Sequence, residues 1–154
     1  MVRIYLDGLP PSMNNAYENI PLRRVGNKMI GGGRRLTAEG ARYKKETIAT
    51  LVRKFPAEMK DLEDKSAPLF LMVRFYFPEV LNRGWPKTAQ TRYKKIDVSN
   101  RLKLFEDCLK DAAGIDDAQN EMIFLEKRMG PERTEAFIWN MNKEVPPIHG
   151  LALI

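Results

Sequence analysis

Side chains that can bind a metal ion and a phosphate are concentrated in one short stretch of the chain, residues 96–119. Its first part contains four spaced polar residues, Asp97, Asn100, Lys103 and Asp107. Two adjacent carboxylates, Asp116 and Asp117, come at its end. Carboxylates bind hard cations such as Mg²⁺, and a neighbouring lysine offsets the charge of a phosphate. The stretch therefore suggests metal-assisted chemistry on a polyanion.

A helix is predicted over residues 98–113, with most of these polar side chains on one face. At about 100° per residue, Lys103 lies one turn from both Asn100 and Asp107. Arg101 and Leu104 fit the pattern poorly. The apolar positions cluster on the opposite side: Val98, Leu102, Phe105, Leu109 and Ala112.

The same polar residues also fit an ordinary solvated helix face. In that interpretation Asp97 or Ser99 is the N-cap of the helix. Lys103 and Asp107 then form a surface ion pair worth only a few tenths of a kcal/mol. Both interpretations stay open until the rest of the chain is considered.

Composition argues against several other kinds of site. The chain has 154 residues with one cysteine, Cys108, and one histidine, His149. A single cysteine excludes an intrachain disulfide and a multi-cysteine zinc site, and it fits a reducing compartment. One histidine in a Pro-rich tail argues against Ser-His-Asp catalysis. No apolar run is long enough to span a bilayer and no signal peptide is visible, so we expect a cytoplasmic protein without membrane contact.

Positive charge is concentrated toward the N-terminus. The net charge is +6, with 11 Lys/Arg against 4 Asp/Glu in residues 1–54 and 7 against 11 in residues 97–154. Residues 18–35 and 79–96 are predicted to be mobile basic loops. In the second loop the cations alternate with Trp85 and Tyr93, which suits a nucleic-acid backbone with stacked bases. A solvated surface loop is the alternative.

The elements are predicted in the order strand, helix, strand, helix, strand, strand, within a single domain over residues 1–154. A helix follows the N-cap Thr37 and ends at Pro56. The strands are predicted at Val2–Leu9, Leu69–Phe77, Met122–Met129 and Thr134–Met141. The third strand in this order and the fourth are expected to pair as a hairpin around Gly130-Pro131-Glu132. This order predicts a two-layer α/β (α+β) fold with a mixed sheet.

Two apolar features have more than one interpretation. The nearly continuous apolar run Leu69–Phe77 predicts a central strand that is covered on both faces. Phe137, Trp139 and Met141 share one face of the last strand and belong to the core or to a subunit interface. The Pro-containing tail 145–154 is either disordered or packed on a partner.

Four segments together resemble the motifs of a known family. They are LPPSMNNAY at Leu9–Tyr17, RRLTAEGARYKK at Arg34–Lys45, KKIDVSNRLKLFEDCL at Lys94–Leu109 and GIDDAQ at Gly114–Gln119. In type and order they resemble the RusA-like Holliday junction resolvases, and Lys127 stands where a later lysine is common. The four motifs together favour a functional site over an ordinary solvated helix face.

The resemblance implies a RusA-like homodimeric endonuclease that cuts four-way or other branched DNA in recombination and repair, using Mg²⁺ or alternatively Mn²⁺. Asp97 and Asp117 match the metal-binding catalytic carboxylates, and Lys103 matches the cation beside the scissile phosphate. Asp116 is a further candidate metal ligand. Motif positions without a defined role are Ser99, Asn100, Asp107, Gln119 and Lys127. Candidate DNA contacts are Asn14, Asn15, Arg34, Arg35, Arg83, Lys87, Arg92, Lys94 and Lys95.

One motif position departs from the family pattern, because Ser99 replaces an expected aspartate. A hydroxyl is a weaker Mg²⁺ ligand than a carboxylate. Either Asp116 compensates, or Ser99 acts through water, or the protein binds junctions and cuts them poorly. Because the other acidic residues are present, we expect retained activity, with a weak or inactive junction-binding module as the alternative.

The predicted helix also creates a geometric difficulty. A straight helix over residues 98–113 separates Asp97 from Asp117 by roughly 20 Å or more. The two carboxylates share a metal only if the helix is shorter or bent, if the connection folds back, or if the second carboxylate comes from another subunit.

Overall fold

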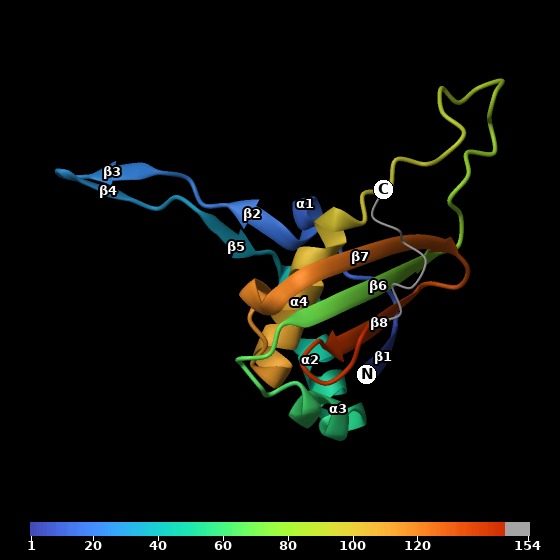
Figure 1. Ribbon diagram of the computed structural model, residues 1–154. Coiled ribbons are helices and arrows are strands. Elements are labelled where there is room, and N and C mark those ends of the chain that lie inside the picture. The colour runs from blue at the N-terminus through green and yellow to red at the C-terminus, as the bar shows by residue number, and fades with distance from the viewer. Residues whose placement is uncertain (147–154) are drawn as a thin grey trace.

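A four-stranded mixed sheet forms the centre of the protein, as shown by a computed structural model that describes residues 1–146 (Figure 1). Its strands are β1 (Val2–Asp7), β6 (Leu69–Phe77), β7 (Asn120–Met129) and β8 (Arg133–Asn140). They lie in the order β1-β8-β6-β7, and only β6 and β7 are parallel. The predicted α+β class with a mixed sheet is confirmed, as is the order of the main elements.

The predicted hairpin between the last two strands is wrong. Strand β6 lies between β7 and β8 and pairs with both of them. Its partners across Val73 are Leu125 on one side and Ala136 on the other. A short glycine-proline turn is compatible with a hairpin, but the long apolar β6 offers two complete edges, and pairing both of them buries more backbone.

Three helices pack against one face of this sheet (Figure 1): α2 (Ala38–Lys54), α3 (Pro56–Asp61) and α4 (Ser99–Ala113). Alternate residues of β6, including Leu71, Val73 and Phe75, are buried against them. The predicted N-cap of α2 is confirmed, because the Thr37 hydroxyl oxygen accepts a hydrogen bond from the Gly40 amide at 3.1 Å.

The opposite face of the sheet carries no helix of residues 1–146. Phe70, Phe137 and Trp139 form a small aromatic cluster there, with ring centroids 5.1 Å apart for Phe70 and Trp139. Met122 and Phe124 of β7 are partly exposed, at 39% and 37%. The prediction that β6 is covered on both faces by other elements is therefore wrong for the described part of the chain, although β6 is a central strand.

Residues 17–36 form an extended arm of short paired strands, where a mobile basic loop was predicted near residues 18–35. Strands β2 (Tyr17–Asn19) and β5 (Arg34–Leu36) pair at its base, and β3 (Arg23–Val25) and β4 (Lys28–Ile30) pair at its tip. Figure 1 shows this arm projecting away from the sheet and helices. The sequence concealed these strands because they are only three residues long and almost wholly exposed.

Residues 79–96 form a second projection, here called the 79–96 loop, which contains no helix or named strand. It is closed by an isolated bridge between Leu81 and Tyr93. The Asn82 amide group also donates to the backbone oxygens of Thr91 and Tyr93. The predicted tail 145–154 lies almost entirely outside the described residues.

Candidate active site

Helix α4 begins at Ser99, and the carboxylate of Asp97 binds the donors of its first turn. Asp97 Oδ1 accepts from the Ser99 amide at 3.0 Å and from the Ser99 hydroxyl at 2.6 Å. Asn100 donates through its amide to Oδ1 and through Nδ2 to Oδ2 at 2.8 Å. These bonds, led by the Ser99 hydroxyl, hold the pKa of Asp97 below its usual value. Asp97 is therefore fixed in position and ionised at neutral pH.

Ser99 has a defined contact in place of the expected carboxylate. Its hydroxyl donates to Asp97, so it fixes the neighbouring acid. An aspartate at the same position would instead repel Asp97 unless a cation lay between them. The substitution thus replaces a negative charge with a hydrogen-bond donor.

Lys103 lies one turn further along α4 and binds two carboxylates. Its Nζ is 2.7 Å from Asp117 Oδ2 and 3.4 Å from Asp107 Oδ1. The hydrogen bond to Asp117 contributes most to raising the pKa of Lys103. Tyr17 of β2 donates to the other oxygen of Asp107 at 2.5 Å, which connects the base of the arm to this group.

The connection after α4 folds back along the helix and brings Asp117 to Lys103. Gly114 ends the helix at a positive φ of 72°, a conformation that glycine adopts without strain. Ile115 then enters the hydrophobic core. The Gln119 side chain donates to the carbonyl oxygens of Asp64 and Ala67 at 3.0 and 3.1 Å. These three anchors explain why the short segment holds a fixed path.

This fold-back shortens the separation between Asp97 and Asp117 that the length of the helix implied. Asp97 binds Asn100, whereas Asp117 binds Lys103, and residues three apart are neighbours on a helix surface. A single chain therefore brings the two acidic motifs to adjacent turns of α4.

Asp116 points to a different set of partners. Its Oδ1 accepts from the Ala118 amide at 3.1 Å, and Lys110 Nζ is 3.1 Å from its Oδ2. Gln119 completes a capping box by accepting from the Asp116 amide. The Ala118 amide is the main cause that lowers the pKa of Asp116 to about 2. In this structure Asp116 caps the short helix η1 (Asp117–Gln119), so compensation for Ser99 by Asp116 gains no support.

Glu106 is a neighbour of the site that sequence reasoning missed. Asn120 Nδ2 donates to its Oε1 at 2.8 Å, and both residues line a small pocket with Asp117. Burial raises the pKa of Glu106. The sequence offered one signal for Glu106, namely that it follows Lys103 by three residues and so lies near it on the helix. An ordinary glutamate on a helix surface would have the same spacing.

The donor types in this region suit a hard divalent cation, since Asp97, Asp117 and Ser99 offer exposed oxygen atoms. Within residues 1–146, however, no three acidic, cysteine or histidine side chains are grouped closely enough to form a metal site. Lys103 donates a hydrogen bond to the carboxylate of Asp117, and Ser99 and Asn100 donate hydrogen bonds to the carboxylate of Asp97. A metal bound here would take oxygen atoms that now accept hydrogen bonds.

The candidate DNA contacts are distributed over the two projections and α1 (Met13–Ala16). Asn14 and Asn15 are exposed on α1, and Arg34 and Arg35 are exposed on β5, where Arg35 binds Glu18 at 2.8 Å. In the 79–96 loop the candidates are Arg83, Lys87, Arg92, Lys94 and Lys95. Glu79, which sequence reasoning also missed, forms ion pairs with two of them, Arg83 and Lys94.

The N-terminal motifs contact each other, and the first of them also contacts α4. The Thr37 hydroxyl donates to the Asn15 carbonyl at 2.6 Å, and an added Cβ at Gly40 would lie 2.4 Å from the Ala16 carbonyl oxygen. Arg101 donates to the Pro10 carbonyl and lies over the Phe77 ring. Its poor fit to the helical pattern thus has a structural cause, and the four sequence motifs converge around α4.

A comparison with protein families decides the classification. The family described as endodeoxyribonuclease RusA matches residues 14–138 of the chain. The protein belongs to the RusA endodeoxyribonuclease family. No curated protein gives a match.

Membership in the RusA family indicates an endodeoxyribonuclease, and this family acts on branched DNA junctions. The match spans Asp97, Lys103 and Asp117, and it also includes Lys127, which is exposed on β7. None of the helices in residues 1–146 has the length and apolar character needed to cross a membrane.

Proposed function

We propose that this RusA family member resolves Holliday junctions by Mg²⁺-dependent hydrolysis of phosphodiester bonds. The observation that supports the proposal most strongly is the fold-back after α4, which brings Asp117 to Lys103 beside the turn bound by Asp97. The two basic projections flank that end of α4 (Figure 1), where they are suited to contact the phosphates of DNA arms.

Asp97 and Asp117 are the residues that would hold the cation, and Ser99 would act on it through Asp97 or through water. When bound, Mg²⁺ supplies an activated water and offsets the charge of the transition state. Ser99 and Asn100 keep Asp97 ionised and oriented. Lys103 contributes a fixed positive charge toward the scissile phosphate. Asp107, bound by Tyr17, holds the lysine from its other side.

We further propose that the protein acts as a homodimer through the open face of the sheet. Exposed apolar side chains that lie next to one another often mark a protein–protein interface. Met122 and Phe124 are 39% and 37% exposed, and they lie beside the buried cluster of Phe70, Phe137 and Trp139. Two symmetric copies would give two sites for two cuts on a two-fold-symmetric junction. Light scattering should give a dimer mass for the wild type and a monomer mass for Phe124→Lys.

Cleavage of a synthetic four-way junction tests the proposed activity. Wild-type protein should nick two opposing strands in Mg²⁺, whereas Asp97→Asn should bind the junction without cutting it. Asp111→Asn is the matched control, because Asp111 is an exposed carboxylate on the same helix that pairs with Lys44 at 2.9 Å. Wild-type protein that binds junctions but never cuts them in Mg²⁺ or Mn²⁺ would rule out the active enzyme.

A weak or inactive junction-binding module is the second candidate, and Ser99 is the observation that favours it. In that case junction affinity should be unchanged by divalent metal, and wild-type protein should not cut. Ser99→Asp should then restore cutting, because it returns a carboxylate to the metal site.

A further inference from the structure

The tip of the arm presents apolar side chains to solvent. Four large ones lie in or next to β3 and β4, and their exposed fractions are 64% for Leu22, 55% for Val25, 62% for Met29 and 48% for Ile30. The β3–β4 ribbon pairs with no other strand of residues 1–146. An isolated two-stranded ribbon is marginally stable in water. A bound partner would therefore both cover these side chains and stabilise the ribbon.

The charges around the tip favour a polyanion as that partner. Residues 19–38 contain five arginines and lysines and no acidic residue. Across the ribbon, Arg23 pairs with Ile30, Arg24 with Met29, and Val25 with Lys28. Side chains of directly opposed residues lie on the same face of a ribbon. Each face thus presents a cation next to an apolar side chain.

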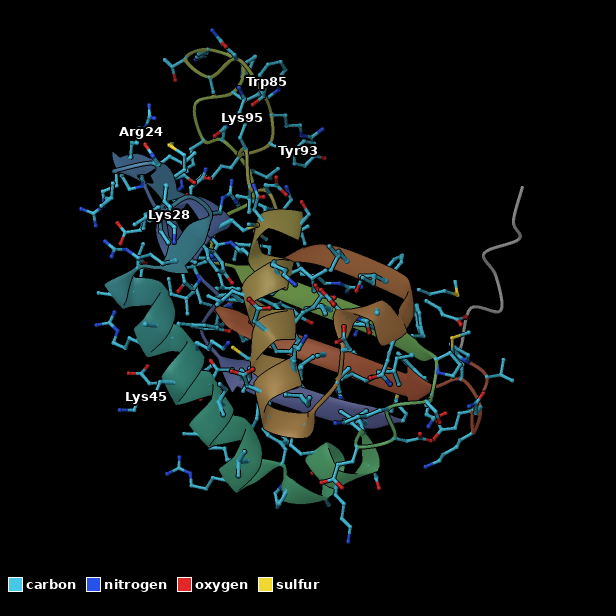
Figure 2. The ribbon with its side chains drawn as sticks, turned by 90° about the vertical axis from the view of Figure 1, so that its left-hand side faces the viewer. Arg24, Lys28, Lys45, Trp85, Tyr93 and Lys95 are labelled. Carbon is cyan, nitrogen blue, oxygen red and sulfur yellow. The ribbon has the colours of Figure 1, made fainter. Side chains whose placement is uncertain are left out.

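The tip and the 79–96 loop project from the same end of the molecule. Figure 1 shows the arm and the loop extending on either side of the N-terminal end of α4, where Asp97 lies. Figure 2 shows Arg24 and Lys28 of the tip at the same end as Trp85, Tyr93 and Lys95 of the loop. DNA bound between these projections would pass over the candidate active site.

We propose that the β3–β4 tip contacts bases at the branch point of the DNA, with Val25, Met29 and Ile30 packing on exposed base faces. The proposal rests on the proposed function and adds a surface for recognising branched DNA. Apolar side chains gain little beside phosphates, whereas they bind well to bases that have lost a stacking neighbour. Base pairs at the centre of an open four-way junction lose such neighbours, while those inside a linear duplex keep them. Arg23, Arg24 and Lys28 contact the adjacent phosphates.

Fluorescence of 2-aminopurine placed at the branch of a synthetic junction tests this contact in EDTA, without cleavage. Wild-type binding should raise the fluorescence, and the triple variant Val25→Ser/Met29→Ser/Ile30→Ser should abolish that rise. The variant should bind the junction roughly tenfold more weakly and bind linear duplex within about twofold of wild type. Circular dichroism should show unchanged folding, since all three side chains are about half exposed or more.

Two control variants separate this contact from other effects. Val52→Ser removes an equally exposed apolar side chain from α2 and should leave both affinities unchanged. Arg24→Gln should weaken binding to junction and duplex alike and reduce the salt dependence. The proposal would be overturned if the triple variant lost affinity equally for junction and duplex, or if it kept the fluorescence rise. Cleavage by wild-type protein would still support the proposed function in either case. Wild-type protein that fails to bind junctions would overturn both.

Discussion

Helix α4 carries two lysines, Lys103 and Lys110, and comparing their variants separates a role in catalysis from a role in surface charge. Lys103 binds Asp117 and Asp107, whereas Lys110 binds Asp116 as its one ion-pair partner in the part of the chain that the structure describes. If Lys103 offsets charge at the scissile phosphate, Lys103→Ala should lower the single-turnover cleavage rate by about 100- to 1,000-fold. Lys110→Ala should change it by less than about threefold. Equal losses in the two variants would contradict the role of Lys103.

Glu106 gives a pH-dependent prediction for stability. Burial raises the pKa of Glu106 in the folded protein, so folding favours its protonated form. The ionised carboxylate is therefore unfavourable above the folded pKa, and this cost disappears as the pH falls below the unfolded value. Glu106→Gln keeps an acceptor for Asn120 and removes the charge.

Thermal unfolding measured against pH tests this prediction for Glu106. The Glu106→Gln variant should melt up to about 3 °C above wild type near pH 8. The difference should vanish near pH 4. A difference that grows toward low pH would contradict the sign of the pKa shift.

The sequence identified site residues by type and spacing, but it did not identify their partners. Asp97, Lys103 and Asp117 were predicted as site residues, and their roles in the reaction stay a prediction. Tyr17 and Glu106 were missed as contacts because each depends on a segment that folds onto α4 from elsewhere. Leu104 fitted the helical pattern poorly yet is fully buried, which shows that α4 packs on more than the sheet.

At the scale of elements, the junction between α1 and α2 depends on one glycine. In a free helix position Gly→Ala stabilises by about 1 kcal/mol. At Gly40 the added Cβ would meet the Ala16 carbonyl oxygen at 2.4 Å. Gly40→Ala should therefore lower the free energy of unfolding by about 1–3 kcal/mol in a denaturant titration. A stabilised variant would contradict the close contact.

Tyr17 connects the arm to the polar face of α4. Its hydroxyl donates to Asp107, which in turn binds Lys103. Tyr17→Phe removes that donor and keeps the ring, so junction affinity should stay within about twofold of wild type. The single-turnover rate should fall by about three- to tenfold, as expected for the loss of one hydrogen bond. An unchanged cleavage rate would show that the hydrogen bond from Tyr17 to Asp107 does not contribute to catalysis.

Local patterns predicted most of the long elements and little of their pairing. The apolar run of β6 matched its observed bounds, and the Thr37 cap fixed the start of α2. The Gly130-Pro131-Glu132 turn suggested a hairpin between β7 and β8. The structure instead places β6 between these two strands, and this pairing joins segments far apart in the sequence, which a local pattern does not reveal. The fold-back at Gly114 was one of three open alternatives, since its anchors at Asp64 and Ala67 are about 50 residues away along the chain.

At the scale of the whole molecule, the proposed dimer raises the question of which subunit completes each site. Within one chain, Asp117 binds Lys103 and Asp97 binds Asn100, and these two residues lie about one turn apart on α4. We therefore infer that each subunit holds a complete site, and that the dimer supplies a second site for the second strand.

Mixed dimers test this central claim most directly. Asp97→Asn and Asp117→Asn chains carrying different tags are co-expressed, and the heterodimer is purified and assayed on a four-way junction in Mg²⁺. If each chain holds its own site, this heterodimer has no intact site and should not nick above either inactive homodimer. A heterodimer of wild type with Asp97→Asn, as the positive control, should nick one strand. Nicking restored in the heterodimer of the two inactive chains would contradict the claim, because one subunit would then supply Asp97 and the other Asp117.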